Sequence, residues 1–204
     1  MNTGHFTAAL AGRDIHAVVI AGSAGGVDAL LKLLPRLPAG FALPVITMLH
    51  LPEQRESRLA ELFGSRMAVP AREASDKEEI SPGTVYFAGS GYHLSIEKDF
   101  RFSLSCEPPV NFARPAIDVL MASAAEAYGP HLAGVLLTGA NQDGAEGMRI
   151  IKEHGGLTVV QLPAEAQVAT MPEQAIKKQA PDLVLTLSDI GDLLLLLEKK
   201  NEGE

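Results

Sequence analysis

Cysteine is nearly absent from this 204-residue sequence, in which Cys106 is the single thiol. One thiol excludes an intramolecular disulfide and a cysteine-based metal cluster. Because Cys106 lies in a strand-like run at residues 101–107, we interpret it as a packed or half-exposed residue rather than a nucleophile. A surplus of basic residues is also lacking, and the formal net charge of −8 argues against a nucleic-acid-binding surface.

Long apolar runs are missing as well. The longest one spans residues 193–197, and the N-terminus lacks a basic start followed by a long apolar region. We therefore predict no membrane insertion and a cytoplasmic location. The chain length and the 47% hydrophobic residues fit one globular domain, which we place at residues 15–200 behind a flexible tail at residues 1–14.

Signatures of bound cofactors are absent too. No Gly-Lys-Ser or Gly-Lys-Thr occurs, which excludes a P-loop, and the glycines at 22, 25 and 26 lack the dinucleotide-binding spacing. There is no His-x-x-x-His pair and no carboxylate cluster with ligand spacing. The sequence therefore predicts neither a cofactor nor a metal site.

What the sequence does contain is a series of continuous apolar segments separated by amphipathic ones. The apolar segments are residues 15–21, 44–49, 131–138, 157–161 and 183–186. Such a pattern is typical of a parallel sheet covered on both faces. Residues 76–107 instead alternate between turns and short strand-like runs. We predict an α/β fold: a doubly wound, mostly parallel sheet with helices on both faces and an antiparallel ribbon insertion.

One exposed hydroxyl lies in the turn after the first apolar segment. Residues 17–30 read A-V-V-I-A-G-S-A-G-G-V-D-A-L, which predicts a buried strand, a tight loop and a helix. Ser23 lies in that loop between small residues, where another molecule can approach it. A serine here fits three roles: a helix N-cap, part of an anion-binding loop, or a nucleophile.

His50 and Asp143 are predicted at the same edge of the sheet as Ser23. His50 closes the second apolar segment, and Asp143 lies in the loop after the segment that ends at Thr138. Ligands of open parallel sheets bind beyond the carboxyl ends of the strands. Ser, His and Asp are the residue types of nucleophilic acyl transfer: the imidazole takes the serine proton, and the carboxylate orients the imidazole. Taken singly, His50 also fits a strand end and Asp143 a helix cap.

Backbone N–H groups are the candidate donors for an oxyanion at this edge. Those of Ala24 and Gly25 follow Ser23 at a helix N-terminus, where the helix dipole favours negative charge. A second donor is expected from the loop at residues 139–143.

Six segments, in order along residues 15–197, resemble the catalytic domain of the chemotaxis-type protein-glutamate methylesterase, CheB. They are I-A-G-S-A-G-G-V-D-A-L, T-M-L-H-L-P, I-S-P-G-T-V-Y-F-A-G-S-G-Y-H-L, F-A-R-P-A-I-D-V-L-M-A-S-A-A, L-L-T-G-A-N-Q-D-G-A-E-G-M and Q-L-P-A-E-A-Q-V-A-T-M-P-E-Q-A-I. The resemblance implies Ser23 as nucleophile, His50 as general base and Asp143 as orienting carboxylate. It also implies hydrolysis of methylated glutamates in the cytoplasmic helices of a chemoreceptor or a similar signalling protein. Glutamine deamidation is known in the family.

The sequence departs from the family pattern at three site positions. The hydroxyl residue usual after the nucleophile is Ala24, and the usual Gly-Met-Gly of the aspartate loop is Gly139-Ala140-Asn141. The resemblance places Ala140 near the oxyanion. These changes motivate two alternatives to a receptor methylesterase: a catalytically weakened regulatory module of the same fold, or a general small-ester hydrolase. The 14 residues before the resemblance also predict a form without the phosphorylatable receiver domain common in the family.

Overall fold

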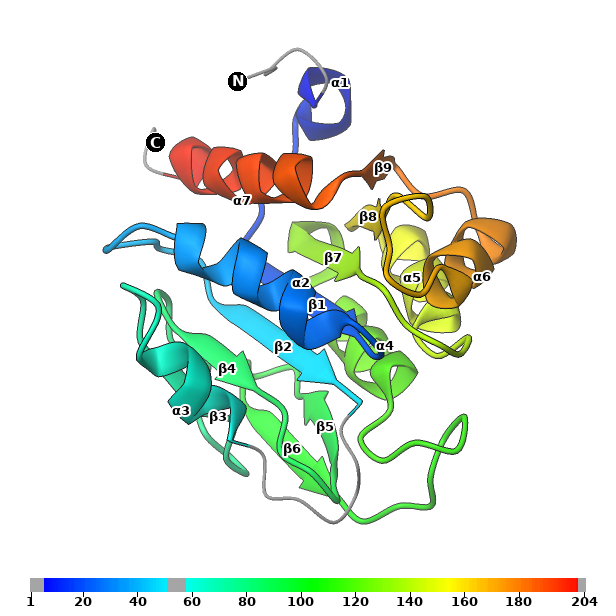
Figure 1. The fold of residues 1–204 in the computed structure, drawn as a ribbon. Coiled ribbons are helices and arrows are strands. Elements are labelled where there is room, and N and C mark those ends of the chain that lie inside the picture. Colours follow the sequence, from blue (N-terminus) through cyan, green and yellow to red (C-terminus); the bar gives the residue numbers. More distant parts are fainter. Residues whose placement is uncertain (1–5, 51–57, 202–204) are drawn as a thin grey trace.

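A seven-stranded, fully parallel sheet forms the centre of the computed structural model, which describes residues 6–50 and 58–201 (Figure 1). The order across the sheet is β3 (Ala71–Glu73), β4 (Val85–Phe87), β2 (Val45–Leu49), β1 (Ala17–Gly22), β7 (Leu132–Leu136), β8 (Leu157–Gln161) and β9 (Leu183–Leu185). All residues of β1, β2, β7 and β8 are buried. Their unbroken apolar sequence follows from this burial, because helices cover both faces.

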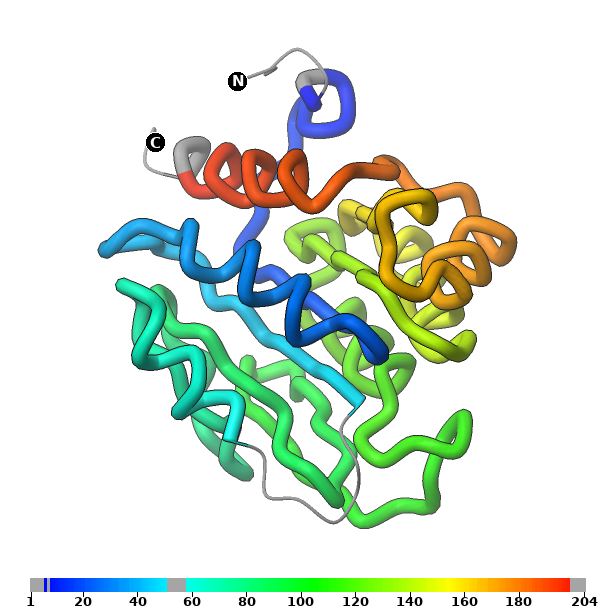
Figure 2. The backbone as a smooth tube through the Cα atoms, viewed as in Figure 1, coloured from blue at the N-terminus to red at the C-terminus, as the bar shows by residue number. Residues whose placement is uncertain are grey.

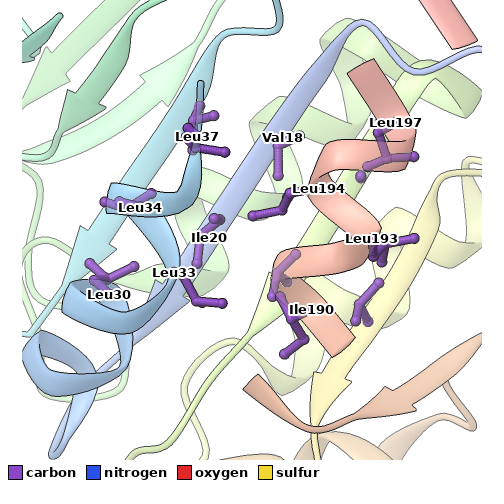
Figure 3. Close-up of a cluster of buried hydrophobic side chains, with 14 of the residues drawn as sticks. Val18, Ile20, Leu30, Leu33, Leu34, Leu37, Ile190, Leu193, Leu194 and Leu197 are labelled. Atoms are coloured by element: carbon purple, nitrogen blue, oxygen red, sulfur yellow. The ribbon is translucent and has the colours of Figure 1, made fainter. Parts of the chain in front are cut away.

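One face of the sheet is covered by three helices that share a hydrophobic core with it. These helices are α2 (Gly26–Leu33), α3 (Leu59–Gly64) and α7 (Leu187–Asn201), and a 3-10 turn, η2 (Leu34–Arg36), follows α2. Figure 3 shows Val18 and Ile20 of β1 between the leucines of α2 and those of α7. Since strand side chains alternate, the remaining residues of β1 face the other way.

The opposite face is covered by α4 (Ile117–Tyr128), α5 (Ala145–Glu153) and α6 (Thr170–Lys178), with a 3-10 turn, η3 (Gly129–His131), after α4. Ala17, Val19 and Ala21 of β1 belong to the core on this side. The ribbon of β5 (His93–Ile96) and β6 (Phe102–Ser105) is antiparallel and packs here as well. The predicted doubly wound α/β fold with an antiparallel ribbon is therefore confirmed.

The strand order creates a topological switch point at β1. The chain leaves β1 for β2 on one side and later adds β7 on the other side. At such a point the two connections diverge and leave a crevice at the carboxyl ends of the strands. Figure 1 shows the arrowheads of β1 and β2 meeting at one edge of the sheet.

The N-terminal segment, residues 1–14, is predicted as a flexible tail, and this stays a prediction. Its described part, from residue 6 onward, contains a short helix, α1 (Thr7–Leu10), close to α7 in Figures 1 and 2. Phe6 and Leu10 are buried in the same core as the leucines of α7. Two apolar side chains are enough to hold this segment on the domain. Residues 1–5 lie outside the described part.

Candidate active site

The three predicted residues Ser23, His50 and Asp143 are brought to one edge of the sheet. Ser23 directly follows β1, His50 directly follows β2, and Asp143 lies between β7 and α5. Backbone hydrogen bonds tie the strand ends together: the His50 N–H donates to the Gly22 carbonyl at 3.2 Å, and the Ser23 N–H donates to the Thr138 carbonyl at 2.9 Å. The gathering expected from the sheet order is thus observed.

The Ser23 side chain does not cap the helix that follows it. The N-cap of α2 is Gly25, and no side chain makes a cap hydrogen bond there. Gly25 has a φ of +80°, and a Cβ at this position would lie 2.6 Å from Oε1 of Gln167. A glycine is therefore required, because both the backbone angle and the close approach exclude a side chain. The half-exposed Ser23 hydroxyl is left without the N-cap role.

Thr138 fixes the Ser23 loop from the end of β7. Its buried hydroxyl donates to the Ala24 carbonyl at 2.9 Å and accepts the Val168 N–H at 2.8 Å. Its own N–H donates to Oε1 of Gln161 at 2.8 Å. Because its carbonyl also accepts from Ser23, this one residue holds two consecutive positions of the loop.

His50 and Asp143 are directly hydrogen-bonded. The His50 Nε2 to Asp143 Oδ2 distance is 2.8 Å, and the carboxylate is fully buried while 14% of the imidazole surface is exposed. An ionised carboxylate accepts only, so Nε2 carries the hydrogen and Nδ1 keeps a lone pair. That nitrogen is then able to accept a proton from a hydroxyl.

Backbone donors hold the Asp143 carboxylate in its ionised form. Oδ2 accepts the Ile117 N–H at 2.7 Å, and Oδ1 accepts the Asp118 and Gly144 N–H groups at 3.1 Å each. Burial raises the pKa of Asp143, but the hydrogen bonds from His50, Ile117 and Asp118 outweigh it, so the pKa lies below the ordinary value. Asp143 thus caps the first turn of α4 and contacts His50 at the same time.

Asp118 and Asn111 were not predicted as site residues. The amide Nδ2 of Asn111 donates to Asp118 Oδ2 at 2.7 Å and to Asp143 Oδ1 at 3.1 Å. Asp118 Oδ1 in turn accepts the N–H groups of Gly144 and Gly147 at 2.8 Å each. Burial and the nearby Asp143 charge raise the pKa of Asp118. One amide therefore bridges two carboxylates that repel each other.

Replacing Asn111 with glycine should remove that bridge without disturbing the backbone, since Asn111 has a φ of +52°, which glycine adopts freely. A hydrogen bond to a charged group is worth about 1.5–3 kcal/mol, so unfolding in urea should show a loss of that size. The ester hydrolysis that the resemblance implies should fall about tenfold because the carboxylate that orients His50 loses a donor. Unchanged activity and stability would contradict a bridging role.

The residues that carry the predicted oxyanion donors are not buried: Ala24 and Ala140 are exposed and Gly25 is half-buried. Among residues 6–50 and 58–201, no hydrogen-bond acceptor is found for the backbone N–H groups of Ala24, Gly25 or Ala140. Those of Ala24 and Gly25 lie at the N-terminus of α2, whose dipole favours an anion. Asn141, next to Ala140, accepts the Asp143 N–H through its side chain at 3.2 Å and so braces the loop.

A cleft of about 360 Å³ opens beside His50. Its other walls are residues 111–115 and Asn141. The imidazole of His50 and the 111–115 loop therefore line one cleft. Ester hydrolysis through an acyl-enzyme requires a hydroxyl, a base oriented by a carboxylate, and N–H donors for the oxyanion. All three kinds of group occur at this edge of the sheet.

One group of potential metal ligands occurs in the described part of the chain. Asp14, His16 and His131 place ligand atoms within 4.8 Å of one another. The two imidazoles are stacked, with their planes only 13° apart. Stacked rings direct their lone pairs side by side rather than at one point. His16 precedes β1 and Ser23 follows it, so this group lies at the opposite edge of the sheet from the candidate site.

These features define an α/β protein with a candidate hydrolytic site at the switch point of its sheet. Residues 18–194 match the family model described as CheB methylesterase. A putative protein-glutamate methylesterase/protein-glutamine glutaminase of Leptospira interrogans is 45% identical over 188 residues, which are 92% of this chain and 97% of that protein. The chain belongs to the CheB methylesterase family, which confirms the resemblance drawn from the sequence.

Two further relatives show how much of the family the chain covers. The protein-glutamate methylesterase/protein-glutamine glutaminase of Clostridium acetobutylicum is 34% identical, and the match covers 89% of this chain but 53% of that protein. The solved catalytic domain of the Thermotoga maritima CheB methylesterase superposes with a TM-score of 0.85 and 32% identity, covering 90% of this chain and 98% of that domain. The chain therefore corresponds to about half of the Clostridium relative and to the catalytic domain of the Thermotoga protein.

Proposed function

We propose that this protein is a protein-glutamate methylesterase that hydrolyses methyl esters of glutamate side chains in a chemoreceptor or similar signalling protein. The observation that carries the proposal is the 2.8 Å hydrogen bond between His50 and the buried Asp143. It lies at the edge of the sheet where Ser23 follows β1. Family membership supplies the substrate class. The substrate segment is the cytoplasmic helical region of the receptor, so the enzyme acts in the cytoplasm. Within the described residues, no helix is long and apolar enough to cross a membrane.

In the first step, the Ser23 hydroxyl attacks the ester carbonyl and His50 Nδ1 takes its proton. Asp143 stays ionised throughout and stabilises the imidazolium through Nε2. The negative oxygen of the tetrahedral intermediate is bound by the N–H groups of Ala24, Gly25 and Ala140. The imidazolium then protonates the departing methoxide, which leaves as methanol.

In the second step, water attacks the acyl-serine. His50 takes a proton from the water and returns one to Ser23 as the ester bond breaks. The products are the free enzyme and a glutamic acid side chain, which releases its proton to water and becomes a carboxylate. Because backbone N–H groups supply the oxyanion donors, the alanines at 24 and 140 do not remove them. This favours an active esterase over the weakened regulatory module.

Deamidation of receptor glutamines is a second candidate activity. The Leptospira and Clostridium relatives carry protein-glutamine glutaminase in their names. The chemistry is the same, with ammonia in place of methanol as the leaving group.

The test is to incubate the protein with a receptor that carries radiolabelled methyl esters and to measure the methanol released. We expect release to continue until the labelled glutamates are consumed, and ammonia release from a receptor with glutamines at the same positions would add the second activity.

Two outcomes would contradict the proposal. Rapid turnover of an aryl acetate with no methanol from the receptor would identify a general small-ester hydrolase. No turnover of either substrate, together with no labelling of Ser23 by a fluorophosphonate, would identify a non-catalytic module.

A further inference from the structure

Phe112 is the most exposed large apolar side chain among the described residues, with its whole surface open to solvent. The other exposed large apolar side chains have more than half of their surface buried, and the ring of Phe100 also packs against Tyr128. Several other aromatic side chains, such as Tyr86 and Phe102, are buried in the core. An aromatic ring left wholly in water is unfavourable for a folded chain by itself.

The backbone at Phe112 is also unfavourable for this residue type. Val110 and Ala113 exchange both of their backbone hydrogen bonds, at 3.1 and 2.9 Å, which makes residues 110–113 a two-residue hairpin turn. The two central residues, Asn111 and Phe112, have φ values of +52° and +61°. Asparagine tolerates this region, and glycine is favoured at the position of Phe112. Neither solubility nor turn geometry accounts for a phenylalanine there.

The loop that carries Phe112 is held at several points. Figure 2 shows it as the long connection between β6 and α4. The buried His93 accepts the Ala116 N–H at 3.2 Å through Nδ1, and its Nε2 donates to the Pro108 carbonyl at 3.1 Å. Asn111 points inward to Asp118 and Asp143, as described above. The turn therefore presents Phe112 outward from a fixed base.

Phe112 stands between two clefts. One is the cleft beside His50, and the other, of about 370 Å³, is lined by Asn111, Phe112, Asn141, Gln142, Thr170 and Gln174. Its ring is enclosed by neither, since it is fully exposed. Phe112 lines the cleft beside His50, yet its ring is fully exposed. A small ester in that cleft therefore covers little of the ring, whereas a polypeptide that extends beyond the ester covers it.

We propose that Phe112 is a specificity-determining residue that contacts an apolar side chain of the protein substrate next to the esterified glutamate. The inference rests on the proposed function and adds the part of the substrate that is recognised outside the reacting group. On a helical substrate, residues three or four positions from the glutamate share its face and lie within reach of a large ring. Phe112 thereby favours a receptor helix over a free ester.

The test compares Phe112→Gly with Phe112→Leu, and with Val184→Ala as the matched control at another exposed apolar residue, on β9 at the far edge of the sheet. The readout is the ratio of kcat/KM for methylated receptor to kcat/KM for an aryl acetate. Phe112→Gly should lower this ratio about tenfold, mostly through KM, because burying an aromatic ring contributes about that factor. Phe112→Leu should keep a ratio close to that of the wild type, and Val184→Ala should leave the ratio unchanged.

Stability separates recognition from a structural role. Since glycine suits the positive φ, Phe112→Gly should have a Tm equal to or above that of the wild type. A ratio unchanged within twofold would overturn the proposal. Equal losses on both substrates would also overturn it, because they would place Phe112 in the architecture of the site.

A binding measurement keeps this inference separate from the proposed function. Receptor affinity is compared between Ser23→Ala and the double variant Ser23→Ala/Phe112→Gly, neither of which requires turnover. If the wild type releases no methanol, the proposed function fails, and weaker binding by the double variant still supports contact at Phe112. Equal binding, or no binding by either variant, would overturn the contact.

Discussion

Replacing Ser23 with alanine should lower methanol release from a methylated receptor by at least about 10⁴-fold, because the acyl-enzyme cannot form without the hydroxyl. The fold should be unaffected. The two backbone hydrogen bonds of Ser23, from its N–H to Thr138 and from Gly26 to its carbonyl, do not involve the side chain. We expect an unchanged Tm and an unchanged structure at the end of β1.

A serine in the first turn of α7 is the control. Ser188, at the start of α7, is exposed, and Ser188→Ala should keep full activity. Labelling by a fluorophosphonate should follow the same pattern, with loss only in Ser23→Ala. Activity within tenfold of the wild type in Ser23→Ala would rule out Ser23 as the nucleophile.

Replacing Asp143 with asparagine should have the second largest effect, about 10⁴-fold in kcat. The carboxylate fixes the imidazole with its hydrogen on Nε2, and an amide nitrogen turned toward His50 favours the other tautomer, in which Nδ1 cannot accept a proton. Asp28→Asn, at an exposed residue in the first turn of α2, is the control for a change of charge near the same edge. If Asp143→Asn keeps a normal kcat, the carboxylate does not orient the base.

Acid unfolding gives a second readout for Asp143. Its pKa is lower in the folded protein than the ordinary value of 3.8. Ionised Asp143 therefore contributes stability above the ordinary value, and this contribution is lost as the pH falls through the lower folded pKa. In Asp143→Asn the contribution is absent at every pH, so stability should depend less on pH in this range. An identical pH dependence in both proteins would contradict the assigned hydrogen bonds.

The position of Ser23, His50 and Asp143 at one edge of the sheet could be predicted because it depends on the order of apolar segments, which the sequence shows directly. Three apolar segments read as parallel strands, and the carboxyl ends of parallel strands share an edge. The fold class followed from the same pattern. Nothing beyond strand order was needed to place these residues near one another.

The roles of Asn111, Asp118 and Thr138 could not be predicted in this way. Asn111 reaches the two carboxylates only because a turn with positive φ directs its amide inward. Asp118 in the first turn of a helix has the ordinary explanation that acidic residues are favourable there. The link from Thr138 to Ala24 joins residues that are distant in sequence and depends on side-chain geometry.

The central place of β1 also governs when during folding the site comes into existence. β1 pairs with β2, which is near in sequence, but also with β7, so that positions 17 and 132 of a 204-residue chain must meet. Closing so long a loop is entropically costly and slow compared with local pairing. A nascent or truncated chain that ends before β7 lacks Asp143 and the Thr138 carbonyl that accepts the Ser23 N–H. Such a chain therefore cannot form the candidate site. Recovery of activity after dilution from denaturant therefore reports completion of the whole sheet, not the formation of its first strand pair.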